Sequence, residues 1–324
     1  MRNIIIRTFG GKDTGYGHYY RCLSLAKAIK LTAKNVHIIF LVNKELHSLI
    51  QTTGFNFIIS NDLNDDLRII ENLDVVLFIF DSYLGNDGYL RHIKNSTRLM
   101  LIDDNNDIYD SSIPNIIYNG NIHAEGLGYK YIKEQTRLLG PEYLIMKEEY
   151  WGNKIPLFPK DGVLITTGGT DEYGIVLNIM NGIKGLDINV RIIIGPGYRN
   201  NYIREIKKNK TQNMELIHKP SSLKEYIDSS KIVITAGGST VYEVISQRSI
   251  PVIFSIVDNQ DLMCGALQEM GVEYLGKYPN IDYSKLRGLL ERLEQDGTFD
   301  EKIFDITNNE GAKIVANTII EQIL

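Results

Sequence analysis

The sequence of 324 residues is poor in cysteine and has no long hydrophobic run. Its two cysteines, Cys22 and Cys264, stand in segments with helical spacing, and neither has a second cysteine at short spacing. We interpret both as free thiols that pack as small apolar side chains. A zinc site built on cysteine is therefore not expected.

Membrane-spanning and secretory features are also missing from the sequence. No apolar run approaches the ~20 residues that cross a bilayer, and no apolar segment followed by a small-residue cleavage site stands near the N-terminus. The formal net charge is -5, whereas a dedicated nucleic-acid-binding protein would show a basic face. We expect a cytoplasmic globular protein without a nucleic-acid partner, and the sequence leaves its oligomeric state open.

The sequence does have short apolar runs that alternate with segments of helical spacing, which indicates βαβ units and a mostly parallel sheet. The alternation breaks between residues 120 and 159, where Pro156 and Pro159 interrupt the chain. We therefore predict an α/β fold of two Rossmann-like domains around a cleft, formed by residues 1–154 and 155–324. The strands that we predict cover residues 3–7, 36–42, 56–59, 75–80, 99–102, 116–118, 162–167, 189–194, 214–218, 232–235 and 251–256.

Two glycine-rich loops of the second domain each follow a predicted strand and precede a predicted helix. They are Gly168-Gly169-Thr170 and Gly237-Gly238-Ser239-Thr240. Glycine lets the backbone approach a phosphate closely, and a helix N-terminus supplies free N–H groups, so Gly169, Thr170, Gly238, Ser239 and Thr240 are candidate phosphate-binding residues. Neither loop has the Walker or the dinucleotide-binding pattern. The alternative is a pair of tight strand-to-helix turns.

Three further polar residues lie near these loops. Glu243 stands in the first turns of the helix that Thr240 begins, where its carboxylate could accept both hydroxyls of a ribose or act as a capping-box acid. Asp258-Asn259-Gln260 follows another predicted strand. The amides of Asn259 and Gln260 could bind sugar hydroxyls or phosphate oxygens, or this segment could cap the next helix.

The loop after the first strand contains Gly15, Gly17 and then His18. It lacks the third glycine of a nicotinamide-binding fingerprint, since Tyr20 stands at that place, and Asn43 stands where an acid is expected. A histidine titrates near neutral pH, and a helix N-terminus favours its neutral form, which can act as a base. His18 is therefore a candidate catalytic base, and local capping or packing is the alternative.

Asp81, Asp103 and Asp104 end later strands, so we expect them at the same edge of the sheet as His18. They could orient His18, hold substrate hydroxyls or bind a metal, or they could only form caps and turns. We predict no metal site, because the other histidines are scattered without ligand spacing. A His-Asp pair without a serine nucleophile does not support acyl transfer.

Several segments, in order, resemble the UDP-sugar hydrolases of the pseudaminic acid pathway, the related spore-coat polysaccharide proteins and, more distantly, the MurG-like GT-B glycosyltransferases. The resemblance spans nearly the whole chain. One difference is that Thr8-Phe9-Gly10-Gly11 follows Arg7, where the family has an Arg-x-Asp pattern. The similar segments are Gly15-Tyr16-Gly17-His18 with Arg21-Cys22-Leu23, Asp81-Ser82-Tyr83, Ile102-Asp103-Asp104, Leu139-Gly140-Pro141-Glu142-Tyr143, Thr167-Gly168-Gly169-Thr170-Asp171, Thr235-Ala236-Gly237-Gly238-Ser239-Thr240 with Glu243, and Asp258-Asn259-Gln260.

The resemblance implies a GT-B fold and hydrolysis of a UDP-linked sugar of the diacetamido-trideoxy type, in surface polysaccharide synthesis. It implies that His18 directs water at the anomeric carbon, with Asp81 as its catalytic partner and UDP held by the second domain. UDP is then part of the substrate, and no separate cofactor is implied. Gly17, Tyr83, Asn259 and Gln260 would bind the substrate. A GT-B glycosyltransferase and a non-catalytic nucleotide-sugar-binding protein are the alternatives.

Overall fold

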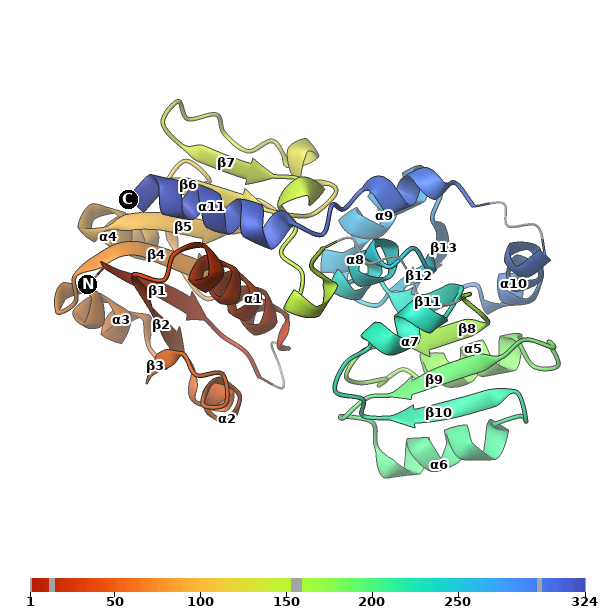
Figure 1. Ribbon diagram of the computed structural model, residues 1–324. Helices are drawn as coiled ribbons and strands as arrows, with labels where there is room; N and C mark the ends of the chain where they lie inside the picture. Colours follow the sequence, from red (N-terminus) through yellow and green to blue (C-terminus); the bar gives the residue numbers. More distant parts are fainter. Residues whose placement is uncertain (1, 12–14, 153–158, 296–298, 324) are drawn as a thin grey trace. The chain divides into compact units, whose positions relative to one another are not determined.

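A computed structural model of the protein describes residues 2–11, 15–152, 159–295 and 299–323 (Figure 1). The chain forms two compact units. Unit 1 comprises Met1–Trp151 with Asn309–Leu324, and unit 2 comprises Gly152–Asn308. No helix in the described ranges is long and apolar enough to cross a membrane.

Unit 1 is built on a seven-stranded parallel sheet with the order β3-β2-β1-β4-β5-β6-β7. The order reverses direction between β1 and β4. In open α/β sheets such a switch point, at the carboxyl ends of the strands, is where ligands bind. The strands are β1 (Arg2–Thr8), β2 (Val36–Val42), β3 (Asn56–Ile59), β4 (Val75–Asp81), β5 (Arg98–Ile102), β6 (Ile116–Asn119) and β7 (Thr136–Leu139).

Helices cover both faces of this sheet. Since alternate strand residues point to opposite faces, each strand contributes side chains to two cores. Helices α1 and α11 lie on one face and α3 and α4 on the other (Figure 1). Ile4 and Ile6 of β1 pack into the core with α1 and α11, whereas Ile5 lies in the core with α3 and α4. The two-sided burial explains why the strands are almost continuously apolar. The helices are α1 (Gly17–Thr32), α2 (His47–Ile50), α3 (Leu63–Glu71), α4 (Asp87–Ser96) and α11 (Gly311–Ile323).

The last helix, α11, belongs to unit 1, whereas the predicted division into residues 1–154 and 155–324 placed it in the second domain. Ala312, Val315, Ala316 and Ile319 of α11 are buried in the core that α1 shares with the first sheet. The chain therefore returns to unit 1 at Asn309, and the range 155–324 is not one compact unit. Sequence periodicity shows that a helix has an apolar face but not which sheet that face will cover.

Unit 2 contains a six-stranded parallel sheet with the order β10-β9-β8-β11-β12-β13. This order repeats that of the first six strands of the other sheet, with the switch point between β8 and β11. Its strands are β8 (Val163–Thr166), β9 (Val190–Ile194), β10 (Met214–His218), β11 (Ile232–Ala236), β12 (Ile250–Ser255) and β13 (Glu273–Lys277). Its helices are α5 (Ile175–Gly182), α6 (Asn200–Asn209), α7 (Lys224–Ser229), α8 (Ser239–Ser246), α9 (Asp261–Glu269) and α10 (Leu286–Gln295).

The predicted α/β class with two parallel sheets is confirmed, and the eleven predicted strands all form, with bounds that differ by at most one or two residues from those given above. Two strands were missed, β7 and β13. Each is the outermost strand of its sheet, and polar residues such as Arg137 and Glu273 interrupt the apolar run. An edge strand buries less of its surface, so its sequence carries a weaker hydrophobic signal.

Candidate active site

His18 lies in the first turn of α1, the helix that follows β1. Gly15 precedes this helix with a φ of 72°, in the left-handed region that glycine adopts without strain. Gly17 begins α1 in open space, since a Cβ atom there would meet no other atom within 4 Å. The loop thus brings the imidazole to the carboxyl edge of the sheet, beside the switch point, and leaves its side chain 16% exposed.

Asp81, the last residue of β4, lies beside His18 and is fully buried. Its Oδ1 is 2.6 Å from Nδ1 of His18. Its Oδ2 accepts a hydrogen bond from Nε of Arg21 at 3.0 Å, and the thiol of Cys22 lies 3.4 Å from the same oxygen. Because an ionised carboxylate only accepts hydrogen bonds, Nδ1 of His18 must carry a proton, and Nε2 is the nitrogen left to act as a base.

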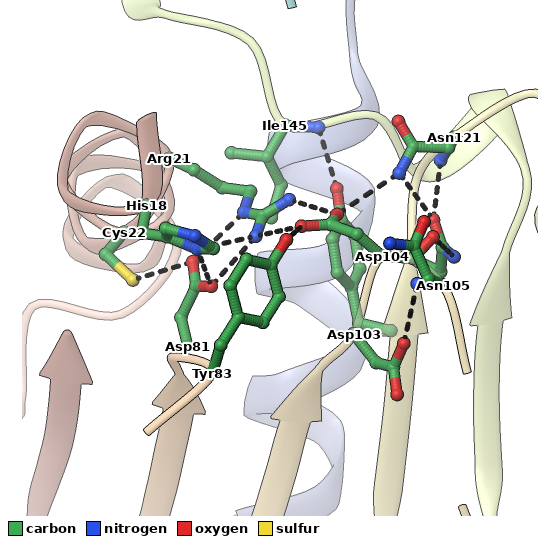
Figure 2. Close-up of polar contacts among 12 residues, drawn as sticks. His18, Arg21, Cys22, Asp81, Tyr83, Asp103, Asp104, Asn105, Asn121 and Ile145 are labelled. Carbon is green, nitrogen blue, oxygen red and sulfur yellow. Dashed lines mark hydrogen bonds and ion pairs between the residues drawn. The ribbon is translucent and has the colours of Figure 1, made fainter. Parts of the chain in front are cut away.

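Arg21 joins this carboxylate to a second one (Figure 2). Its guanidinium donates two hydrogen bonds to Asp81 and two to Asp104, the latter at 2.6 and 3.1 Å. In the sequence, Arg21 stands out only as part of the segment that contains His18. Its spacing from His18 is a usable signal, because residues three apart lie on the same face of a helix.

Tyr83 completes the cluster around His18. Its hydroxyl donates to Oδ2 of Asp104 at 2.8 Å, and its ring meets the imidazole edge-on with centroids 4.8 Å apart. Asp104 also accepts a hydrogen bond from the amide of Asn121, a residue that is not among the predicted site residues. Asp103 has a different role, because its Oδ1 accepts the backbone N–H groups of residues 105 and 106 and so forms the turn after β5.

The charges around His18 shift its proton affinity upward. Burial lowers the pKa of His18. The ion pair and hydrogen bond with Asp81 raise it, and the net result is a pKa above the ordinary 6.5. The sequence led us to expect that the helix N-terminus favours the neutral imidazole, and in the structure the carboxylate of Asp81 is the group that favours the protonated form. Burial raises the pKa of Asp81, whereas Arg21 and His18 hold it well below its usual range, so this carboxylate is ionised.

The predicted nucleotide-binding loops lie at the carboxyl edge of the second sheet. Gly169 and Thr170 follow β8, Gly238 leads into α8 after β11, and Asn259 follows β12. Because β8, β11 and β12 are neighbours in the sheet, these loops are neighbours along its edge, and they flank its switch point. Gly169, Thr170, Ser239 and Asn259 are exposed.

The two glycine loops lead into helices with different N-termini. Asp171 accepts the backbone N–H groups of Ile175 and Val176 at 2.9 and 2.8 Å, so a carboxylate of the chain itself occupies the N-terminus of α5. The N-cap residue of α8 is Gly238, which has no side chain with which to cap the helix. The N–H groups at the start of α8 are therefore the ones that suit an anionic ligand.

The other predicted residues of unit 2 lie on α8 and in the segment between β12 and α9. Glu243 lies on α8 and is buried. Gln260 uses its side-chain oxygen to accept the N–H of Ile256 at 2.7 Å, so it shapes its own loop. Asp258 pairs with Lys277, and the N-cap residue of α9, Gln260, makes no side-chain capping hydrogen bond. Among the residues that the structure describes, no group of three or more acidic, histidine or cysteine residues is arranged to hold a metal ion.

Comparison with known proteins places the chain by its fold. No family model matches the sequence. A curated relative, the uncharacterized protein MJ1062 of Methanocaldococcus jannaschii, is 26% identical over 267 residues, which are 77% of this chain and 54% of the relative. The chain thus spans about half the length of that relative.

Solved structures match almost the whole chain. MurG of Acinetobacter baumannii aligns with a TM-score of 0.70 and 11% identity, and the glycotransferase of kitacinnamycin with 0.71 and 13%, each over 99% of both chains. The UDP-GlcNAc 2-epimerase of Neisseria meningitidis, bound to UDP-GlcNAc, aligns with 0.65 and 11%, also over 99% of both. At these identities the likeness establishes the fold, and the chain has the GT-B fold of MurG with two Rossmann-like units.

Proposed function

We propose that this protein is an enzyme that hydrolyses a UDP-linked sugar. Water attacks the anomeric carbon, the bond from that carbon to the diphosphate oxygen breaks, and UDP leaves with the electron pair. The observation that carries the proposal is the hydrogen bond of 2.6 Å between His18 and Asp81 at the switch point of the first sheet. The fold and the ordered motifs of the sequence support it.

His18 is the proposed general base. Asp81 holds the proton on Nδ1, so Nε2 takes the proton of the attacking water and the carboxylate stabilises the imidazolium that forms. Tyr83 lies against the imidazole ring and Gly17 begins the same helix, so these two residues are proposed to contact the sugar.

The second unit is proposed to bind UDP. Gly169, Thr170, Gly238, Ser239 and Thr240 would hold the diphosphate through backbone N–H groups and hydroxyls. The start of α8, where the N-cap residue is a glycine, suits the charge that develops on the leaving group. Glu243 would bind the ribose hydroxyls. Asn259 and Gln260 would contact the diphosphate or the sugar.

The sugar class comes from the sequence resemblance. A diacetamido-trideoxy sugar linked to UDP, consumed in the cytoplasm during surface polysaccharide synthesis, is the proposed substrate. UDP is part of that substrate, and the proposal uses no further cofactor. A glycosyltransferase is the second candidate, because MurG and the kitacinnamycin glycotransferase share the fold and the same dyad could deprotonate an acceptor hydroxyl.

A turnover screen tests the proposal. The protein is incubated with a panel of UDP-sugars that includes diacetamido sugars, without any acceptor, and free sugar and UDP are measured by mass spectrometry. Stoichiometric release of both is expected. Release that needs an added acceptor would indicate the glycosyltransferase, and UDP binding without turnover under either condition would indicate a binding protein. Glu243→Gln should weaken UDP binding, with Glu225→Gln on α7 as the control.

A further inference from the structure

We infer that Arg21 is a positioning residue for the reaction at His18. It clamps Asp81 and Asp104 together, fixes the hydrogen bond between His18 and Asp81, and offsets part of the carboxylate charge around the imidazole. The inference rests on the proposed function where it concerns catalysis. Its structural part, which concerns the ring of His18, does not depend on the identity of the substrate.

The geometry of the clamp holds the carboxylate of Asp81 in one orientation. Nη2 and Nε of Arg21 lie 2.8 and 3.0 Å from Oδ1 and Oδ2 of Asp81, which is a side-on bidentate contact. Oδ1 is also the atom that bonds Nδ1 of His18. Rotation of this carboxylate away from His18 would therefore break the contacts with Arg21 as well.

Asp104 fixes the other side of the guanidinium. Its two oxygens lie 2.6 and 3.1 Å from Nη1 and Nη2 of Arg21, and they also accept hydrogen bonds from Tyr83 and Asn121. Arg21 thus links α1 to the ends of β4 and β5, as Figure 2 shows. A lysine has a single ammonium and cannot make two bidentate contacts at once.

The charge balance around His18 also depends on Arg21. The described groups that face the imidazole are Arg21 from α1, Asp81 from β4, Tyr83 from the following loop, and Asp104 from the end of β5. The two carboxylates raise the pKa of His18, and Arg21 lowers it. Nη2 of Arg21 lies 3.2 Å from Nδ1 of His18, and both atoms carry protons, so this contact is repulsive rather than a hydrogen bond.

The experiment is an NMR titration of the His18 ring in the wild type and in two variants, Arg21→Gln and Arg21→Lys. His18→Asn assigns the signal, and nitrogen-15 shifts report which ring nitrogen carries the proton. In Arg21→Gln we expect the pKa of His18 to rise by about one unit, because a nearby positive charge is lost. In Arg21→Lys the positive charge remains, so the pKa of His18 should move little. The fraction of neutral His18 rings that carry the proton on Nδ1 should fall, because a lysine cannot fix the carboxylate of Asp81 through a bidentate contact.

Arg68→Gln is the control, because Arg68 forms an exposed ion pair with Asp65 on α3 and should leave His18 unchanged. If Arg21→Gln does not fold, the tautomer populations in Arg21→Lys decide the question. An unchanged pKa in Arg21→Gln, or an unchanged tautomer in Arg21→Lys, would overturn the inference. The titration needs no substrate, so it can succeed even if no UDP-sugar is hydrolysed. With turnover established, the pH-rate midpoint should move upward in Arg21→Gln by the same amount.

Discussion

Nδ1 of His18 and Oδ1 of Asp81 lie 2.6 Å apart although 63 residues separate them in the chain. The first residue is on α1 and the second ends β4, and the parallel pairing of β1 with β4 brings the two together. The dyad is therefore a product of the strand order at the switch point, where α/β proteins bind ligands.

Replacement of Asp81 by asparagine tests the role of the carboxylate. Asp81→Asn should lower kcat by about a thousandfold or more, because an amide can stabilise the wrong tautomer of His18 and cannot stabilise the imidazolium. UDP affinity should stay within about twofold of the wild type, since the proposed UDP-binding residues belong to unit 2. Steady-state kinetics and calorimetric UDP titration measure the two quantities. Equal losses of kcat and UDP affinity would argue against this division of roles.

The proposed role of His18 as the base, together with its raised pKa, predicts the pH dependence of turnover. A base must be unprotonated, and a raised pKa keeps the imidazole protonated to a higher pH. Activity should therefore fall as the pH decreases through a midpoint above the ordinary 6.5. A pH profile of kcat/KM measures this midpoint. A midpoint clearly below 6.5 would contradict the conclusion that Asp81 raises the pKa of His18 by more than burial lowers it.

Gly237 is expected to be intolerant of a side chain. A Cβ atom there would lie 2.2 Å from Sγ of Cys264, so Gly237→Ala should destabilise the protein by about 1–3 kcal/mol. The double variant Gly237→Ala with Cys264→Ala should recover most of that loss, because the obstructing sulfur is gone. Gly238→Ala is the matched control, since a Cβ atom there meets nothing within 4 Å. Denaturant unfolding compares the variants, and equal destabilisation by both glycine substitutions would refute the steric explanation.

Truncation of Ile319 tests whether α11 is part of the core of unit 1. This side chain is fully buried with residues of α1, so Ile319→Ala should lower the free energy of unfolding by about 2–5 kcal/mol. Leu31→Ala on α1 is the control, because Leu31 is 64% exposed and its truncation should change stability by less than about 0.5 kcal/mol. A similar small effect of both substitutions would show that α11 is not needed by the core.

Much of the fold could be predicted because it depends on local patterns. Apolar runs such as Ile4-Ile5-Ile6 mark buried strands, and the histidine and the acid at the strand ends could be placed at one sheet edge from topology alone. The unit to which α11 belongs could not be predicted, because an apolar helix face fits either sheet. The edge strands β7 and β13 were missed because polar residues weaken their pattern.

The site was predictable in its elements but not in its connections. His18, Asp81 and Tyr83 could be chosen from spacing and resemblance. In the structure, Asp81 and Tyr83 both contact the imidazole ring of His18. The different roles of Asp103 and Asp104 could not be foreseen, because adjacent residues at a strand end point in different directions. The upward shift in the pKa of His18 likewise depends on distances that no sequence pattern gives.

The most direct test of the account is hydrolysis in water enriched in oxygen-18, with the UDP product analysed by mass spectrometry. We predict that wild-type protein releases UDP without oxygen-18, because water attacks the anomeric carbon and the sugar side of the bond breaks. His18→Asn should release UDP at least about a hundredfold more slowly, since the proposed general base is gone. Label in the UDP, or undiminished release by His18→Asn, would contradict the account.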